Sequence, residues 1–128
     1  MEQKQSIVER LIAKVNEEEK AGPERKSVFV PALGVEIECE QLELDDVLDL
    51  MDRYGTDQSR KSLEFQRELI YMSCKLFRSE KLQKGLNIGD PVSVVKKVLG
   101  RNFDNYNVLT STILSMNGLG DVEEQVKN

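Results

Sequence analysis

Residues 27–40, SVFVPALGVEIECE, decide the fold, because the apolar pattern changes here from a helical period to a strand period. Val35, Ile37 and Cys39 alternate with three glutamates, which is typical of a strand with one buried and one solvated face. SVFV is a second β-rich run, and PALG supplies the turn between the two runs. The stretch therefore predicts one β-hairpin, which helices must cover because an isolated hairpin is only marginally stable.

The glutamates of the second strand, Glu36, Glu38 and Glu40, are expected to share the solvated face. Three carboxylates in this arrangement could hold a hard cation such as calcium. The alternative is a charged face that discourages pairing with another sheet edge. No Gly/Asn loop of the calcium-binding kind lies nearby, which favours the second interpretation, and no metal site is expected.

Before the hairpin, five aliphatic residues at helical spacing predict an amphipathic helix over residues 4–20: Ile7, Val8, Leu11, Ile12 and Val15. Ala-Gly-Pro at 21–23 ends this helix. Residues 1–25 are therefore expected to be a helix and a linker, with docking of the helix on the body left open.

After the hairpin the helical period returns, and the apolar spacing and end signals predict helices near residues 43–54, 59–78, 91–99 and 103–117. The second of these has two neighbouring apolar rows, which is typical of the central helix of a bundle. Residues 78–89, RSEKLQKGLNIG, are expected to form a basic loop or short helix. We expect a mainly α (α+β) fold, a compact bundle of about five helices with one small N-terminal β-hairpin. The domain should span residues 26–118, and residues 119–128 should form a frayed tail.

Composition excludes several classes of chemistry. The 128 residues include no histidine and only two cysteines, so histidine-dependent catalysis, histidine-ligated zinc and four-thiolate metal sites are excluded within this chain. Phosphate-binding glycine motifs are absent as well. We expect no catalytic, cofactor-binding or metal-binding residues and no enzyme activity. Cys39 and Cys74 are interpreted as buried free thiols, with a disulfide between them as the alternative.

Charge is distributed unevenly along the chain. Residues 1–57 carry 7 basic and 15 acidic side chains, a net charge of −8, whereas residues 58–101 carry 10 basic and 4 acidic side chains, a net charge of +6. The simpler interpretation is a set of solvated helix faces of uneven sign. The alternative is a small nucleic-acid-associated regulatory protein that uses the basic segment.

The order of elements resembles the XkdN-like family of phage tail assembly chaperones over roughly residues 28–119. The segments that carry the resemblance are the strand-to-helix entry at 36–46, LIYMSCKLF at 69–77, DPVSVVKKVLG at 90–100 and MNGL at 116–119. Relatives tend to have a longer Asp/Gly-rich hairpin turn than the PALG of this chain, so the resemblance leaves the strand register open.

The resemblance implies a non-catalytic protein of the bacterial host cytoplasm that binds the tape measure protein and assists tail tube assembly. It also implies contact with the major tail protein as a further partner and absence from the mature virion. We expect no membrane partner, because no apolar stretch approaches the roughly 20 residues that cross a bilayer, and no nucleic acid partner, because the first half of the chain is acidic. Self-association stays open. The N-terminal sequence is charged and has no apolar signal region, which agrees with a cytoplasmic expectation.

A chaperone for an apolar helical partner needs an apolar face with a charged periphery. We expect this face on the two C-terminal helices, at Val92, Val95, Lys96, Leu99, Phe103 and Tyr106. The alternative is that the same apolar residues close the core of the bundle.

Overall fold

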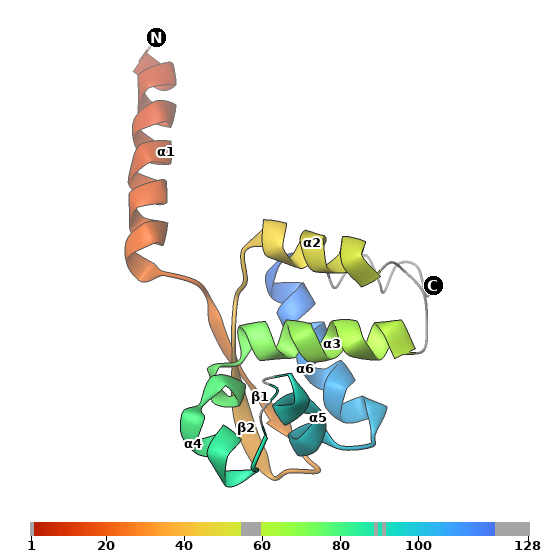
Figure 1. Ribbon diagram of the computed structural model, residues 1–128. Helices are drawn as coiled ribbons and strands as arrows, with labels where there is room; N and C mark the ends of the chain where they lie inside the picture. Colours follow the sequence, from red (N-terminus) through yellow and green to blue (C-terminus); the bar gives the residue numbers. More distant parts are fainter. Residues whose placement is uncertain (1, 55–59, 89, 91, 120–128) are drawn as a thin grey trace.

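The computed structural model describes residues 2–54, 60–88, 90 and 92–119, and it shows a body of short helices around a β-hairpin with one helix projecting from it (Figure 1). The helices are α1 (Glu2–Ala21), α2 (Leu44–Tyr54), α3 (Arg60–Ser73), the 3-10 helix η1 (Lys75–Arg78), α4 (Glu80–Gly85), α5 (Ser93–Leu99) and α6 (Phe103–Met116). The strands are β1 (Arg25–Val30) and β2 (Val35–Glu40). A mainly α fold with one small N-terminal hairpin is thereby confirmed.

The hairpin forms as its alternating pattern predicts. The strands are antiparallel, and Val28 of β1 lies opposite Ile37 of β2 on the buried face. Gly34 closes the turn with a φ of +66°, a conformation that suits glycine. The hairpin's buried side chains join the core between the strands, α3 and α6, so the helices cover its apolar face.

The predicted central helix over 59–78 is interrupted, which the sequence pattern did not indicate. Helix α3 ends at Ser73, Cys74 has an extended conformation, and η1 follows. The guanidinium group of Arg78 donates hydrogen bonds to the carbonyls of Tyr71 and Met72 at 2.7 and 2.6 Å. These bonds satisfy carbonyl groups that the ending helix leaves without partners. The interruption places Phe77, which is fully buried, in the core.

The segment after η1 contains helix α4, for which the side chain of Ser79 accepts a hydrogen bond from the Leu82 amide. Helix α5 begins at Ser93, and the expected start at 91 lies outside the described residues. The Ser93 amide donates to the Asp90 carbonyl at 3.1 Å, and the Ser93 hydroxyl donates to the Asp90 carboxylate at 2.7 Å. Asp90 therefore supports the start of the helix, and Gly100, with a φ of +74°, ends it.

The remaining boundaries differ from the expectations by one or two residues. Strand β1 begins one residue before the expected domain start at 26, and α6 ends one residue before the expected 117. Helix α1 includes the expected 4–20 and projects away from the body (Figure 1). The expected frayed tail lies outside the described residues except for Leu119, which packs on the edge of the core.

Candidate functional site

The structure corrects half of the partner-binding face expected from the sequence. Val95, Leu99 and Tyr106 are at most 1% exposed and belong to the core. Helix α5 packs against α3, so the protein's own fold covers the apolar side of α5. These three residues therefore lie where the alternative interpretation put them, in the core of the bundle.

The other three residues of that face lie at or near the surface. Val92 is half-buried, Lys96 is exposed, and Phe103 is 44% exposed. Phe103 lies edge-to-face against Tyr106, with ring centroids 6.3 Å apart. Only a small apolar area therefore remains accessible at this end of α5 and α6.

A larger uncovered apolar surface lies on α1. Its five aliphatic side chains, which we call the α1 stripe, are each between 52% and 58% exposed: Ile7, Val8, Leu11, Ile12 and Val15. They share one side of the helix, because they follow the helical period. The sequence revealed this stripe but could not show that nothing in the described part of the chain covers it.

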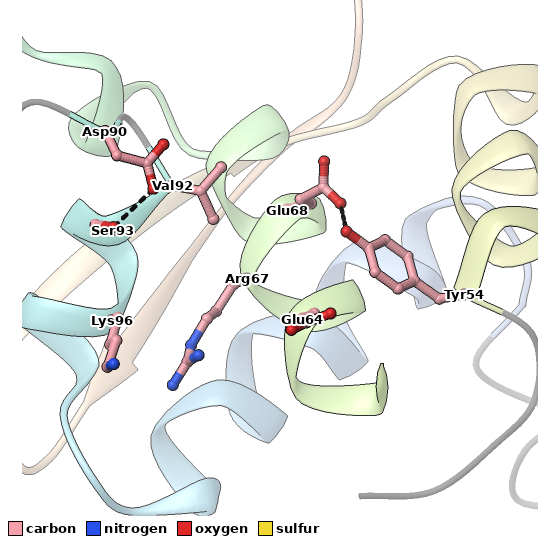
Figure 2. A pocket seen from close by; sticks show the side chains of 8 residues that line it. All are labelled: Tyr54, Glu64, Arg67, Glu68, Asp90, Val92, Ser93 and Lys96. Carbon is pink, nitrogen blue, oxygen red and sulfur yellow. Dashed lines mark hydrogen bonds between the residues drawn. The ribbon is translucent and has the colours of Figure 1, made fainter. Parts of the chain in front are cut away.

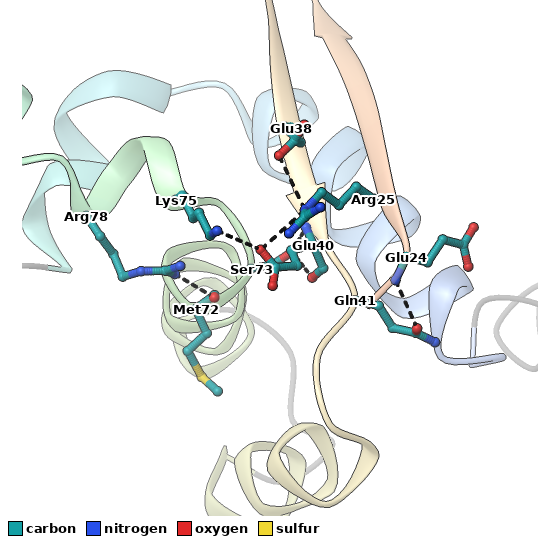
Figure 3. A network of polar contacts seen from close by, with 9 residues as sticks. All are labelled: Glu24, Arg25, Glu38, Glu40, Gln41, Met72, Ser73, Lys75 and Arg78. Atoms are coloured by element: carbon teal, nitrogen blue, oxygen red, sulfur yellow. Dashed lines mark hydrogen bonds and ion pairs between the residues drawn. The ribbon is translucent and has the colours of Figure 1, made fainter. Parts of the chain in front are cut away.

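The connection between α1 and the body is held by a polar network (Figure 3). The Glu24 amide donates to the side chain of Gln41 at 3.4 Å, and the Gln41 amide donates to the Glu24 carbonyl at 2.8 Å. The side-chain amide of Gln41 also donates to the carbonyl of Met116, at the end of α6, at 2.7 Å. The segment that follows α1 is therefore fixed to the body immediately before β1 begins.

Ion pairs extend this network across the outer face of the hairpin (Figure 3). Arg25 lies 3.8 Å from both Glu38 and Glu40, and Lys75 lies 3.5 Å from Glu40. Two of the three glutamates considered as calcium ligands thus face cations of the protein. Within the described ranges, no group of three or more metal-ligating side chains occurs.

A polar cleft of about 370 Å³, which we call the Arg67 cleft, lies between the end of α2, the outer side of α3 and the start of α5 (Figure 2). The Arg67 side chain extends into it, and its guanidinium carbon lies 5.5 Å from the centroid of the Tyr106 ring. The Tyr106 hydroxyl donates to the Gly100 carbonyl at 2.8 Å, which fixes the ring beneath this cation.

The cleft contains charges of both signs and no constellation for catalysis among its described residues. Two of its three acidic members have partners: Glu68 accepts from Tyr54 and from Arg53, and Asp90 accepts from Ser93. The third, Glu64, is exposed. A Ser–Lys pair would be the only nucleophile arrangement that a chain without histidine could offer here. The Ser93 hydroxyl donates to the Asp90 carboxylate instead, so it is already engaged at the start of α5.

Two cysteines meet beneath the hairpin. The Sγ atoms of Cys39 on β2 and Cys74 after α3 are 3.6 Å apart, and both side chains are fully buried as free thiols. The hydrogen bond with Cys39 and burial raise the pKa of Cys74, whereas the hydrogen bond with Cys74 lowers the pKa of Cys39. The sequence indicated two buried thiols but could not indicate their proximity.

Comparison with known proteins identifies a shared fold. No protein-family model matches the chain, and no curated protein matches it. No helix in the described ranges combines the length and apolar character needed to cross a membrane. Among solved structures, the chain is similar to the crystal structure of the protein YqbN, a structural genomics target. The two are 21% identical, with a TM-score of 0.53 over 75% of this chain and 86% of that chain, so they share the fold.

Proposed function

We propose that this chain is a non-catalytic tail assembly chaperone of a phage or prophage that binds the tape measure protein in the bacterial cytoplasm and assists tail tube assembly, with the major tail protein as a further partner. The resemblance of residues 28–119 to the XkdN-like family supports this proposal. The structural observation that carries it is the exposed α1 stripe, an apolar helix face on a helix that projects from the body.

The α1 stripe has the chemistry that pairing with another amphipathic helix requires. Helix α1 has 20 residues, which at about 1.5 Å per residue gives a length of about 30 Å. Aliphatic side chains along one side can pack into the apolar face of a partner helix, while charged residues on the other sides keep the free protein in solution. A tape measure protein, which is long and helical in this family, would offer such a face.

This proposal moves the main partner-binding surface from the two C-terminal helices to α1. Val95, Leu99 and Tyr106 cannot contact a partner while the core is intact, since they are at most 1% exposed. Lys96 and Phe103 remain accessible, and they are candidates for a second contact with an extended partner.

Co-purification tests the proposal. The genomic neighbourhood is first searched for a tape measure gene, and its product is then co-expressed with the wild type, with Leu11→Glu and with Ala13→Glu. Leu11 belongs to the α1 stripe, whereas Ala13 is exposed on the opposite side of the same helix, so the two variants add the same charge to different faces. We expect Leu11→Glu to reduce recovery of soluble tape measure protein at least about tenfold, because a charge in an apolar contact costs well over 1.4 kcal/mol. Ala13→Glu should match the wild type.

Equal recovery with both variants would reject the α1 stripe as the binding surface. Failure of the wild-type chain to bind or solubilise the tape measure protein would reject the chaperone function itself. The nucleic-acid alternative has its own measurement, since a regulator that uses the basic segment 58–101 should bind duplex DNA with an affinity that falls steeply as salt rises. We expect no such binding at physiological salt.

A further inference from the structure

We infer that Cys39 and Cys74 are a cross-linking site, at which a low-molecular-weight disulfide oxidises the two thiols to an intramolecular disulfide that clamps the hairpin to the end of α3. The inference is independent of the proposed function, because it rests on the placement of two side chains inside the body. Their Sγ atoms are 3.6 Å apart, although the residues are 35 positions apart in the sequence.

The backbone beside the two cysteines is already tied together, so their approach is built into the fold. The amide of Glu40 donates to the Ser73 hydroxyl at 3.1 Å, and the same hydroxyl donates to the Glu40 carbonyl at 2.8 Å. Glu40 follows Cys39 and Ser73 precedes Cys74, so this pair of hydrogen bonds holds the end of β2 against the end of α3 (Figure 3).

Formation of the bond requires only a local adjustment. A disulfide has a sulfur–sulfur distance of about 2.05 Å, so the Sγ atoms must approach by about 1.5 Å, a displacement within reach of two side-chain rotations. Cys74 has an extended backbone conformation between two helical segments, and its amide still donates to the Ile70 carbonyl at 2.9 Å. The backbone therefore holds Cys74 at the end of α3, and the adjustment falls on the two side chains. Cys39 lies opposite Lys26 in the hairpin register, near the end of the hairpin that is connected to α1. The disulfide would therefore attach this end of the hairpin to the end of α3.

The reaction is a pair of thiol–disulfide exchanges. The thiolate of Cys39 attacks one sulfur of oxidised glutathione, forming a mixed disulfide and releasing one glutathione thiolate. The thiolate of Cys74 then attacks the Cys39 sulfur and displaces the second glutathione. The two cysteines lose two protons and two electrons in total, and one glutathione disulfide is reduced to two thiols. Both side chains are fully buried, so the reagent must reach them through a transient opening of the hairpin.

The test equilibrates the full-length native chain with a glutathione redox buffer, quenches it with acid and alkylates the remaining thiols under denaturing conditions. Mass spectrometry then counts the intramolecular disulfide, the free thiols and the glutathione adducts. A parallel sample is equilibrated in guanidinium chloride. The equilibrium constant for forming the intramolecular disulfide should be on the order of 100-fold larger in the native chain than in the unfolded chain. This ratio is expected when a disulfide stabilises a fold across a loop of this length.

The variants Cys39→Ser and Cys74→Ser provide matched controls, since each keeps the size of the side chain and removes one reaction partner. Neither should gain thermal stability in the oxidised buffer, whereas the wild-type melting temperature should rise by about 10 °C. A native wild-type chain that shows no preference over the unfolded chain would overturn the inference. The same holds if stable glutathione adducts or intermolecular dimers replace the intramolecular bond.

Discussion

The side-chain amide of Gln41 donates a hydrogen bond of 2.7 Å to the carbonyl of Met116, joining the residue after β2 to the last residue of α6. The next residue of each segment makes a second bond with donor and acceptor exchanged: the side-chain amide of Asn117 donates to the Leu42 carbonyl at 2.9 Å. Both bonds satisfy carbonyl groups that regular secondary structure leaves open. The pair closes the body across 75 positions of sequence.

Replacement of Gln41 by Glu should destabilise the protein by about 1–3 kcal/mol at pH 7, because a carboxylate cannot donate to the Met116 carbonyl. The change preserves the length of the side chain and its oxygen acceptor for Glu24, so it isolates the lost donor. Ionisation is disfavoured beside a carbonyl, which raises the pKa of the introduced carboxyl in the folded state. The deficit should therefore shrink as the pH falls and the protonated carboxyl becomes a donor. Urea unfolding at pH 7 and pH 4, compared with the wild type, measures both effects.

Substitution of Val95 by Asp should unfold the body, since Val95 is fully buried and the new carboxylate would have no partner. The expected cost of more than about 4 kcal/mol is a large part of the stability of a small domain. Lys96→Asp is the matched control at the next position. It is exposed, and we expect a change below about 1 kcal/mol. Tyrosine fluorescence and one-dimensional NMR distinguish the two; a folded Val95→Asp variant would restore this side of α5 as a candidate binding face.

The sequence predicts those elements whose signal is local. The alternation at Val35, Ile37 and Cys39 is visible within the strand itself, and the hairpin formed there. The interruption of the central helix at Cys74 depends on tertiary contacts, since Arg78 reaches back to the helix carbonyls and Ser73 bonds across to β2. No periodicity within 59–78 encodes either contact, so a continuous helix was the natural expectation.

The candidate site shows the same division. An apolar stripe on α1 and an apolar row on α5 look alike as patterns, because both follow the helical period. The three-dimensional structure separates them: Val95 is covered because α5 packs against α3, whereas Leu11 on α1 is 58% exposed. Sequence reasoning therefore identified two apolar helix faces but could not show that the fold buries the one on α5 and leaves the one on α1 exposed. The proximity of the two cysteines was equally invisible, since it depends on how β2 meets the end of α3.

Alanine substitutions at two glycines should change stability in opposite directions. Gly100 has φ and ψ of 74° and −138°, a backbone region that is strongly unfavourable for residues with a Cβ. Gly100→Ala should therefore lower the free energy of unfolding by about 1–3 kcal/mol. Gly85 ends α4 in a helical conformation with no atom within 4 Å of an added Cβ. Gly85→Ala should therefore stabilise by about 0.4–1 kcal/mol through loss of unfolded-state entropy. Urea midpoints at constant m-value measure both, and equal signs would contradict the backbone explanation.

Helix α1 should melt independently of the body. Its stripe contacts no core residue in the described chain, and an isolated helix of about 20 residues is only marginally stable in water. All three tyrosines lie in the body, so tyrosine fluorescence reports the body alone, whereas far-UV circular dichroism reports both parts. On heating, we expect a gradual loss of ellipticity from α1 before the cooperative fluorescence transition.

Two leucine variants make this prediction quantitative. Leu11→Ala should change the unfolding free energy of the body by less than about 0.5 kcal/mol, because the side chain is 58% exposed on α1. Leu69→Ala makes the same change in a fully buried side chain of α3 and should cost about 2–5 kcal/mol. If Leu11→Ala destabilises the body as strongly as Leu69→Ala does, the stripe packs on the body in solution. A partner would then have to displace it, and the α1 stripe could not be the open binding surface that we propose.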